Sequence, residues 1–167
     1  MTTPRTSPGE SVVLVDGTNV IRYGFPMVPA RFERLLTICV ELLVCRSSDL
    51  LCVFDANTRY TLRYQQGPRH EAAYCLLLER LPSLFVECTG GTRADEILLA
   101  ESEARGATIV SNDRFRAYEQ DYPWLGDHSR FLRFNEVRSF LHFAGTRQPP
   151  ARVEDALEQL LRAADAT

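Results

Sequence analysis

Short apolar runs alternate along the chain with longer segments whose apolar residues recur at helical spacing. Continuous runs of four or five apolar residues are typical of parallel strands buried on both faces. Such strands are predicted at Ser11–Val15, Leu50–Phe54, Leu84–Glu87, Ala107–Ser111 and Phe131–Phe134. Helical spacing predicts helices over Arg31–Arg46, Pro68–Leu81 and Arg93–Arg105, and a short helical stretch ends near Tyr122. The alternation predicts an α/β fold with a central, mostly parallel sheet of about five strands and helices on both faces.

Composition along the chain divides it into four parts. Residues 1–10 are a polar, Pro-containing tail, and residues 11–145 hold the predicted strands and helices of one domain. The segment 146–152 is rich in Pro, Arg and Gln and is expected to be a linker, and residues 153–165 form a last amphipathic helix. The apolar stripe of this helix packs either on the domain itself or on a partner, such as a second copy or another protein. Packing on the domain is favoured, because an apolar stripe commonly finds the nearest core.

The net charge of −3 argues against a general polyanion binder. The chain has no lysine, however, so all 19 Lys and Arg positions are Arg, the better bidentate ligand for phosphate. An all-Arg composition also hints at a GC-rich bacterial genome. With 45% apolar residues in 167, the chain can build one full core.

The five cysteines are odd in number, show no C-x-x-C spacing and lie within or beside apolar runs. Most are therefore expected to be buried thiols in a reducing compartment. No apolar run reaches the roughly 18 residues that a membrane-spanning helix needs. These features predict a cytoplasmic protein without a membrane segment.

Aspartates follow three of the predicted strands. Asp16 and Asp55 end the first two apolar runs, and Asp113 follows the fourth. Asp95 lies in the first turn of the helix before that fourth strand, and this helix runs antiparallel to the strands. All four carboxylates are therefore expected at the carboxyl edge of the sheet, where open α/β folds bind ligands. Clustered carboxylates raise one another's pKa, and a hard divalent cation such as Mg²⁺ or Mn²⁺ relieves the repulsion.

Each aspartate also has an ordinary structural explanation. A lone Asp after a strand is usually a turn former or a helix N-cap. The convergence of Asp16, Asp95 and Asp113 favours a shared site over three separate caps. For Asp55, a turn at Asp55-Ala56-Asn57 and a place among the site acids both stay open.

Three motifs in order resemble those of one family. They are the strand and D-G-x-N of Val13–Ile21 (VLVDGTNVI), the acidic helix start of Thr92–Leu99 (TRADEILL) and the S-N-D segment of Ile109–Arg116 (IVSNDRFR). Together they resemble the NYN domains of the PIN-like nuclease superfamily, both the Regnase-type ribonucleases and the bacterial NYN proteins. The likeness covers roughly Ser11 to Phe143.

The resemblance implies a PIN-like three-layer sandwich and endonucleolytic cleavage of single-stranded RNA. It implies Mg²⁺ or Mn²⁺ held by Asp16, Asp95 and Asp113, with Asn19 as a further polar residue of the site; Asp55 is counted with the candidate catalytic residues. The chain departs from the Regnase-type pattern by carrying Asp95-Glu96 where two aspartates are common, and it has no Cys/His zinc finger.

Candidate substrate-binding residues lie within or beside these motifs: Thr18, Arg93, Asn112, Arg114 and Arg116. Arginines next to a metal site are suited to phosphate oxygens, although a solvated surface position is the alternative for each. That alternative is preferred for Arg59 and Arg63. Tyr60 and Tyr64 could stack bases, and Phe115 belongs either to such a surface or to the core.

Other enzyme classes fail on spacing. The chain has no G-x-x-x-x-G-K-[ST] and no G-x-G-x-x-G after its first strand. Thr18 stands where a haloacid-dehalogenase-type phosphatase would need its second aspartate. The strongest rival is an NYN module that binds RNA or serves as a scaffold without catalysis. A DNA-directed or toxin-type PIN-like nuclease is also left open.

Overall fold

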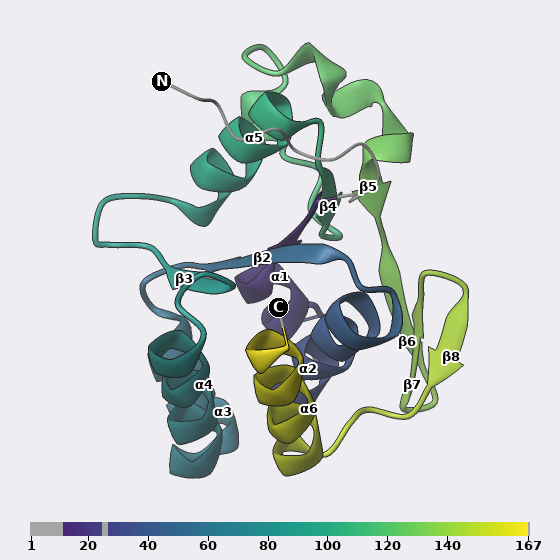
Figure 1. Ribbon diagram of the computed structural model, residues 1–167. Coiled ribbons are helices and arrows are strands. Elements are labelled where there is room, and N and C mark those ends of the chain that lie inside the picture. Colours follow the sequence, from purple (N-terminus) through teal and green to yellow (C-terminus); the bar gives the residue numbers. More distant parts are fainter. Residues whose placement is uncertain (1–11, 25–26, 167) are drawn as a thin grey trace, which may run out of the picture.

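Five parallel strands form the central sheet of the computed structural model, which describes residues 12–24 and 27–166 (Figure 1). They are β1 (Val12–Asp16), β2 (Asp49–Phe54), β3 (Phe85–Glu87), β4 (Thr108–Val110) and β5 (Phe131–Leu132). Their order is β3-β2-β1-β4-β5, so β1 lies at the centre. The expected α/β fold with about five mostly parallel strands is confirmed. The expected tail, residues 1–10, lies outside the described residues, as does Ser11.

The two faces of the sheet bury alternate residues of each strand. Leu14, Val53 and Ile109 point into one apolar cluster, and Val15 and Phe54 point into the other. Helix α5 (Ala94–Arg105) packs on the first face. The second face is covered by α1 (Gly17–Arg22), α2 (Phe32–Val40), α4 (Pro68–Arg80) and α6 (Val153–Asp165) (Figure 1). Helices therefore lie on both faces, as predicted.

Most helix predictions agree with the structure, and two helices were not predicted. The helix expected over 31–46 is α2 continued by a π-helical turn, η1 (Glu41–Cys45). Helix α5 ends at Gly106, whose φ of 64° is the left-handed conformation that glycine favours. The unexpected helices are α1 and α3 (Thr58–Gln66). Only Thr58 and Leu62 of α3 are buried, so this helix has no apolar stripe to reveal it.

A small antiparallel sheet follows β5 and was not predicted. It consists of β6 (Phe134–Val137), β7 (Phe140–Phe143) and β8 (Thr146–Gln148). Strand β8 lies in the segment expected to be a linker, and its pairing with β7 corrects that expectation for residues 146–148. The short helix expected before Tyr122 is instead a 3₁₀ turn, η2 (Arg116–Tyr118), and two more such turns follow, η3 (Pro123–Gly126) and η4 (His128–Arg130).

The last helix, α6, packs on the chain itself. Val153, Ala156 and Leu160 are buried in the same cluster as α2 and α4, between which α6 lies (Figure 1). Packing at home, the favoured alternative, is therefore confirmed. All five cysteines are free thiols, and Cys39, Cys52 and Cys88 are buried. No helix within the described residues is long and apolar enough to cross a membrane.

Candidate active site

The order of strands reverses between β1 and β4. From β1 the chain proceeds to β2 and β3 on one side, then returns to β4 and β5 on the other. Ligands of open α/β sheets bind at the carboxyl ends of the strands at this switch point. Asp16 ends β1 there, and Ser111, Asn112 and Asp113 follow β4. The Ser111 hydroxyl donates to Oδ2 of Asp16 at 2.9 Å, so the end of β1 is joined directly to the loop after β4.

Asp16 is nearly inaccessible, with 4% of its surface exposed. Its Oδ1 accepts a hydrogen bond from the backbone N of Asn19 at 3.1 Å, so the carboxylate caps α1. Burial raises its pKa to about 7; the bonds from Asn19 and Ser111 oppose the rise, and the charges of Asp95 and Asp55 add to it. Asp16 is therefore both the N-cap of α1 and a member of the acidic group.

Gly17 owes its place in the D-G-x-N motif to packing. A Cβ on Gly17 would lie 2.3 Å from Cε1 of Phe54 and 2.9 Å from Sγ of Cys52. Real Cβ atoms do not approach other atoms so closely, so α1 can pass this close to Phe54 and Cys52 of β2 only with glycine at position 17. The glycine therefore allows the start of α1 to pack closely against β2.

Asp95 and Asp55 complete the acidic group. Asp95 is the second residue of α5 and is half-buried. Its pKa is raised by burial and then by the negative charges of Asp113 and Asp55. Oδ1 of Asp55 accepts from the backbone N of Ala94 at 3.1 Å, so Asp55 caps α5 and ties the helix to the end of β2. Asp55 is thus close to the other acids, and its carboxylate also holds a helix end.

Asp113 is the exposed acid of the group. Its Oδ1 accepts from the backbone N of Phe115 at 2.8 Å, and its own N donates to Oγ of Ser111 at 3.1 Å. Phe115 has a φ of 49°, a left-handed conformation that is rare for a bulky residue. Its ring is buried and stacked on Phe131 at 6.1 Å, which places Phe115 in the core rather than among base-stacking residues. The buried ring anchors a strained turn that presents Asp113 to solvent.

Asn19 and Asn112 act on backbone groups. Oδ1 of Asn19 accepts from the backbone N of Asn112 at 2.9 Å. The Asn112 side chain bonds both backbone groups of Phe134, donating to its O at 2.8 Å and accepting from its N at 3.2 Å. Asn112 borders the cavities described below, but its amide is engaged with β6. The structure thus gives it a positioning contact where a substrate contact was expected.

Thr18 does not face solvent. Only 7% of the residue is exposed. Its hydroxyl accepts from the backbone N of Asp55 at 2.8 Å and bonds the hydroxyl of Thr58 at 2.8 Å. In the structure Thr18 joins α1 to the β2–α3 loop, and its expected contact with substrate stays a prediction.

Two adjoining cavities open at this edge. One, of about 650 Å³, is lined by Asn19, Arg93, Asp95 and Asp113 among others. The other, of about 1120 Å³, extends toward η2, η3 and η4. Both are lined by a shared set of four residues, Tyr23, Asn112, Arg114 and Arg116. The predicted arginines thus lie beside Asp113.

Ser111, Tyr23 and Arg133 were not predicted as site residues. Arg133 Nη1 donates to the backbone O of both Ser111 and Asp113, each at 2.5 Å. Burial and the charge of Arg114 lower the Arg133 pKa, so the two guanidinium groups lie near each other. The sequence signal for Ser111 is its place inside the S-N-D motif, whereas Arg133 lies inside the run predicted as the fifth strand, which does not mark it as a site residue. Tyr23 gives no such signal.

The spacing and chemistry of the acidic side chains decide whether they can hold a divalent cation. Across residues 12–24 and 27–166, no three acidic, His or Cys side chains lie close enough together to hold one ion directly. The donor set nevertheless consists of carboxylate oxygens, which Mg²⁺ and Mn²⁺ prefer, and Mg²⁺ keeps several waters when it binds few carboxylates. The raised pKa values of Asp16 and Asp95 show that negative charge is disfavoured here without a cation. The chemistry of the site therefore fits such an ion.

A family model described as the Zc3h12a-like ribonuclease NYN domain matches residues 9–159. The chain belongs to this family. The resemblance read from the three motifs is confirmed, and the NYN domain accounts for nearly the whole chain. No curated protein matches the sequence.

Solved structures similar to this NYN domain include nuclear proteinaceous RNase P 2 from A. thaliana, with a TM-score of 0.63 and 20% identity. A second structure, of Arabidopsis thaliana nuclear protein-only RNase P 2, gives a TM-score of 0.61 and 19% identity. Each match covers 87% of this chain and 31% of the other. The chain thus spans about a third of the length of these structures. At this identity the likeness shows the fold, which is PIN-like as expected.

Proposed function

We propose that this NYN domain is a metal-dependent endoribonuclease that cleaves single-stranded RNA. The observation that carries the proposal is the placement of Asp16, Asp95 and Asp113 at the switch point, where the charge of Asp95 acts on Asp16 and that of Asp113 acts on Asp95. A groove lined by Arg114 and Arg116 lies beside them. The family is one of ribonuclease domains, which supports RNA as the substrate.

Asp16, Asp95 and Asp113 would hold Mg²⁺ or Mn²⁺, with Asp55 next to them. A bound ion would stabilise negative charge developing on the phosphate and lower the pKa of the attacking water. Asp95 and Asp113 both line the smaller cavity, and Asp113 is the more exposed of the two, so its carboxylate is the more accessible to substrate. Asp16 is buried and hydrogen-bonded, so it sets the position of the other groups more rigidly.

Asn19, Ser111 and Arg133 are positioning residues in this proposal. Each bonds the loop that carries Asp113: Asn19 holds the N of Asn112, and Arg133 holds two carbonyls. Arg93, Arg114 and Arg116 would contact phosphate oxygens. Among the described residues, none of these three arginines forms an ion pair.

The test is cleavage of labelled single-stranded RNA, and of DNA of the same sequence, with Mg²⁺, with Mn²⁺ and with excess chelator. We expect RNA cleavage with either metal and none with chelator. Asp113→Asn should lower the rate by roughly 100-fold or more, because metal assistance contributes several kcal/mol. Asp121→Asn, another exposed acid outside the acidic group, is the matched control and should cleave normally.

Each contrary outcome points to a specific alternative. Cleavage in excess chelator, or full activity of Asp113→Asn, would contradict a metal mechanism at these acids. RNA binding without cleavage would identify a module that has lost catalysis. Preferential cleavage of DNA would show that DNA, and not RNA, is the substrate.

A further inference from the structure

The larger cavity has more basic than acidic lining residues and extends from the acidic group toward η2, η3 and η4. Its walls include Arg114, Arg116, Arg133 and His128, and Glu119 is the one acid among its described lining residues. No ion pair joins these three arginines to any acid in the described part of the chain. Asp113 is the acid whose charge acts on Arg133, whereas the exposed Arg114 and Arg116 have no ion-pair partner among the described residues, and such charge favours an anionic ligand.

Tyr23 stands where this cavity meets the acidic one. It borders both cavities and is 39% exposed. Its ring is held edge-to-face against Phe134, with centroids 5.2 Å apart. The guanidinium of Arg34 lies 5.8 Å from the ring centroid. An exposed ring that is fixed from behind is a platform for a nucleobase.

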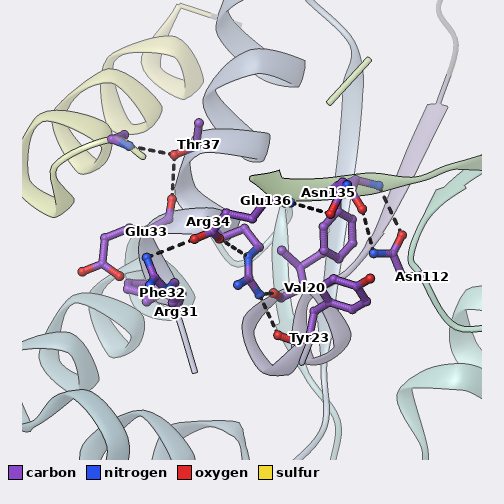
Figure 2. A network of polar contacts seen from close by, with 12 residues as sticks. Val20, Tyr23, Arg31, Phe32, Glu33, Arg34, Thr37, Asn112, Asn135 and Glu136 are labelled. Atoms are coloured by element: carbon purple, nitrogen blue, oxygen red, sulfur yellow. Dashed lines mark hydrogen bonds and ion pairs between the residues drawn. The ribbon is translucent and has the colours of Figure 1, made fainter. Parts of the chain in front are cut away.

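A buried network fixes the backbone that carries Tyr23. Figure 2 shows Arg34, a residue of α2, with hydrogen bonds to Val20, Tyr23 and Glu136. Its Nη1 donates to the backbone O of Val20 at 2.9 Å and of Tyr23 at 3.2 Å, and its Nε donates to Glu136 at 2.9 Å. Arg34 is 2% exposed, so this contact is shielded from water. Tyr23 is thereby preorganised for stacking before any ligand arrives.

We propose that the groove formed by Tyr23, Arg114, Arg116 and Arg133 binds the single-stranded RNA that leaves the acidic site on this side. One unpaired base next to the scissile phosphate stacks on Tyr23, and the arginines hold the following phosphates. The inference rests on the proposed function, because the acids define where the scissile phosphate lies. The groove, of about 1120 Å³, adjoins the cavity lined by Asp95 and Asp113 and shares Tyr23, Arg114 and Arg116 with it, so a strand can pass from one to the other.

A second surface with similar residues allows a sharp control. Helix α3 exposes Tyr60 at 62% and Tyr64 at 87%. Its arginines, however, face the same acid: Arg59 and Arg63 lie 3.8 Å and 3.4 Å from Glu71. Glu71 thus offsets part of the charge on α3, whereas no ion pair within the described residues offsets the charge of Arg114 and Arg116 in the groove. The structure therefore assigns the RNA path to the groove rather than to α3.

The test is fluorescence anisotropy with a short, unstructured, labelled RNA in chelator, where no cleavage is needed for a signal. Tyr23→Ala should weaken binding roughly tenfold, as loss of one stacked base does, and Tyr23→Phe should bind as wild type. Tyr64→Ala is the matched control and should bind as wild type. With a fully paired RNA duplex, Tyr23→Ala and wild type should bind alike, because no base is free to stack.

Charge is tested with two double variants of equal net change. Arg114→Ala/Arg116→Ala should reduce the slope of log affinity against log salt by about 1.4, since each phosphate contact on a single strand contributes roughly 0.7. Arg59→Ala/Arg63→Ala should leave the slope unchanged. Equal effects of the two double variants, or normal single-strand binding by a folded Tyr23→Ala, would contradict RNA binding in the groove. Since binding is measured without metal, such a result leaves RNA cleavage by the acids standing, and absence of cleavage leaves the groove standing.

Discussion

Asp16 at the end of β1 and Asp113 in the loop after β4 both lie at the carboxyl edge of the sheet, but the structure holds them in opposite ways. Asp16 is buried, capping α1 and bonded to Ser111. Asp113 is exposed, on a turn whose strain is offset by the buried ring of Phe115. One acid is therefore part of the folded core, and the other is displayed by it. Substitutions at the first should disturb stability, and substitutions at the second should disturb chemistry.

The largest effect is expected at Gly17, which follows Asp16 at the start of α1. Gly17→Ala would place a Cβ 2.3 Å from a ring carbon of Phe54, so helix or strand must shift. We expect a loss of about 3 kcal/mol in the free energy of unfolding, measured by urea denaturation. Gly126→Ala is the control, because its Cβ would meet nothing within 4 Å. A stable Gly17→Ala variant would show that α1 is packed less tightly than described.

The next effect is a pH dependence specific to Asp16. Its pKa rises from 3.8 in the unfolded chain to about 7 in the metal-free folded state. The contribution of Asp16 is therefore full below about pH 4 and is lost as the pH rises toward 7, since only the unfolded chain ionises readily. Between pH 5 and pH 8 the loss should be about 2–3 kcal/mol.

Urea denaturation in chelator at these two pH values measures that loss. Asp16→Asn should remove most of the difference, because the neutral amide does not ionise. Asp113→Asn should keep it. If both variants retain the wild-type pH dependence, burial of Asp16 is not its source.

A smaller effect is expected at Ser111, which joins the end of β1 to the loop after β4. Ser111→Ala removes the hydroxyl that donates to Asp16 and accepts from the N of Asp113. Ser111 is fully buried, so we expect a loss of about 1–2 kcal/mol in the free energy of unfolding. Ser83→Ala, at an exposed serine, should be neutral. A neutral Ser111→Ala would mean that the end of β1 and the loop after β4 are positioned independently.

Much of the fold followed from periodicity, and the failures have physical causes. The strands and α5 were predictable because continuous or evenly spaced apolar residues mark buried faces. Helix α3 was missed since only two of its residues are buried, and its remaining side chains are polar or exposed. The antiparallel sheet was missed because its first turn uses Arg138 and Ser139 at φ of 51° and 65°, where Gly or Asn is the usual signal.

The site was predicted in its acids and less well in its polar residues. Topology alone delivers Asp16, Asp95 and Asp113 to one edge. It does not show whether a side chain such as Thr18 points into the groove or between elements. Tyr23 and Arg133 reach the groove through α1 and β5, and their contacts with Phe134 and with the loop carbonyls are tertiary. No local pattern encodes such contacts.

The most direct test of the central claim is the melting temperature of the domain with and without Mn²⁺. An ion that binds the folded state alone stabilises it by mass action. We predict that millimolar Mn²⁺ raises the melting temperature of the wild type, and that Asp95→Asn/Asp113→Asn folds normally in chelator but loses the shift. The control Asp121→Asn should keep it. A wild-type melting curve that Mn²⁺ leaves unmoved, or an equal shift in the double variant, would contradict a metal site at these acids.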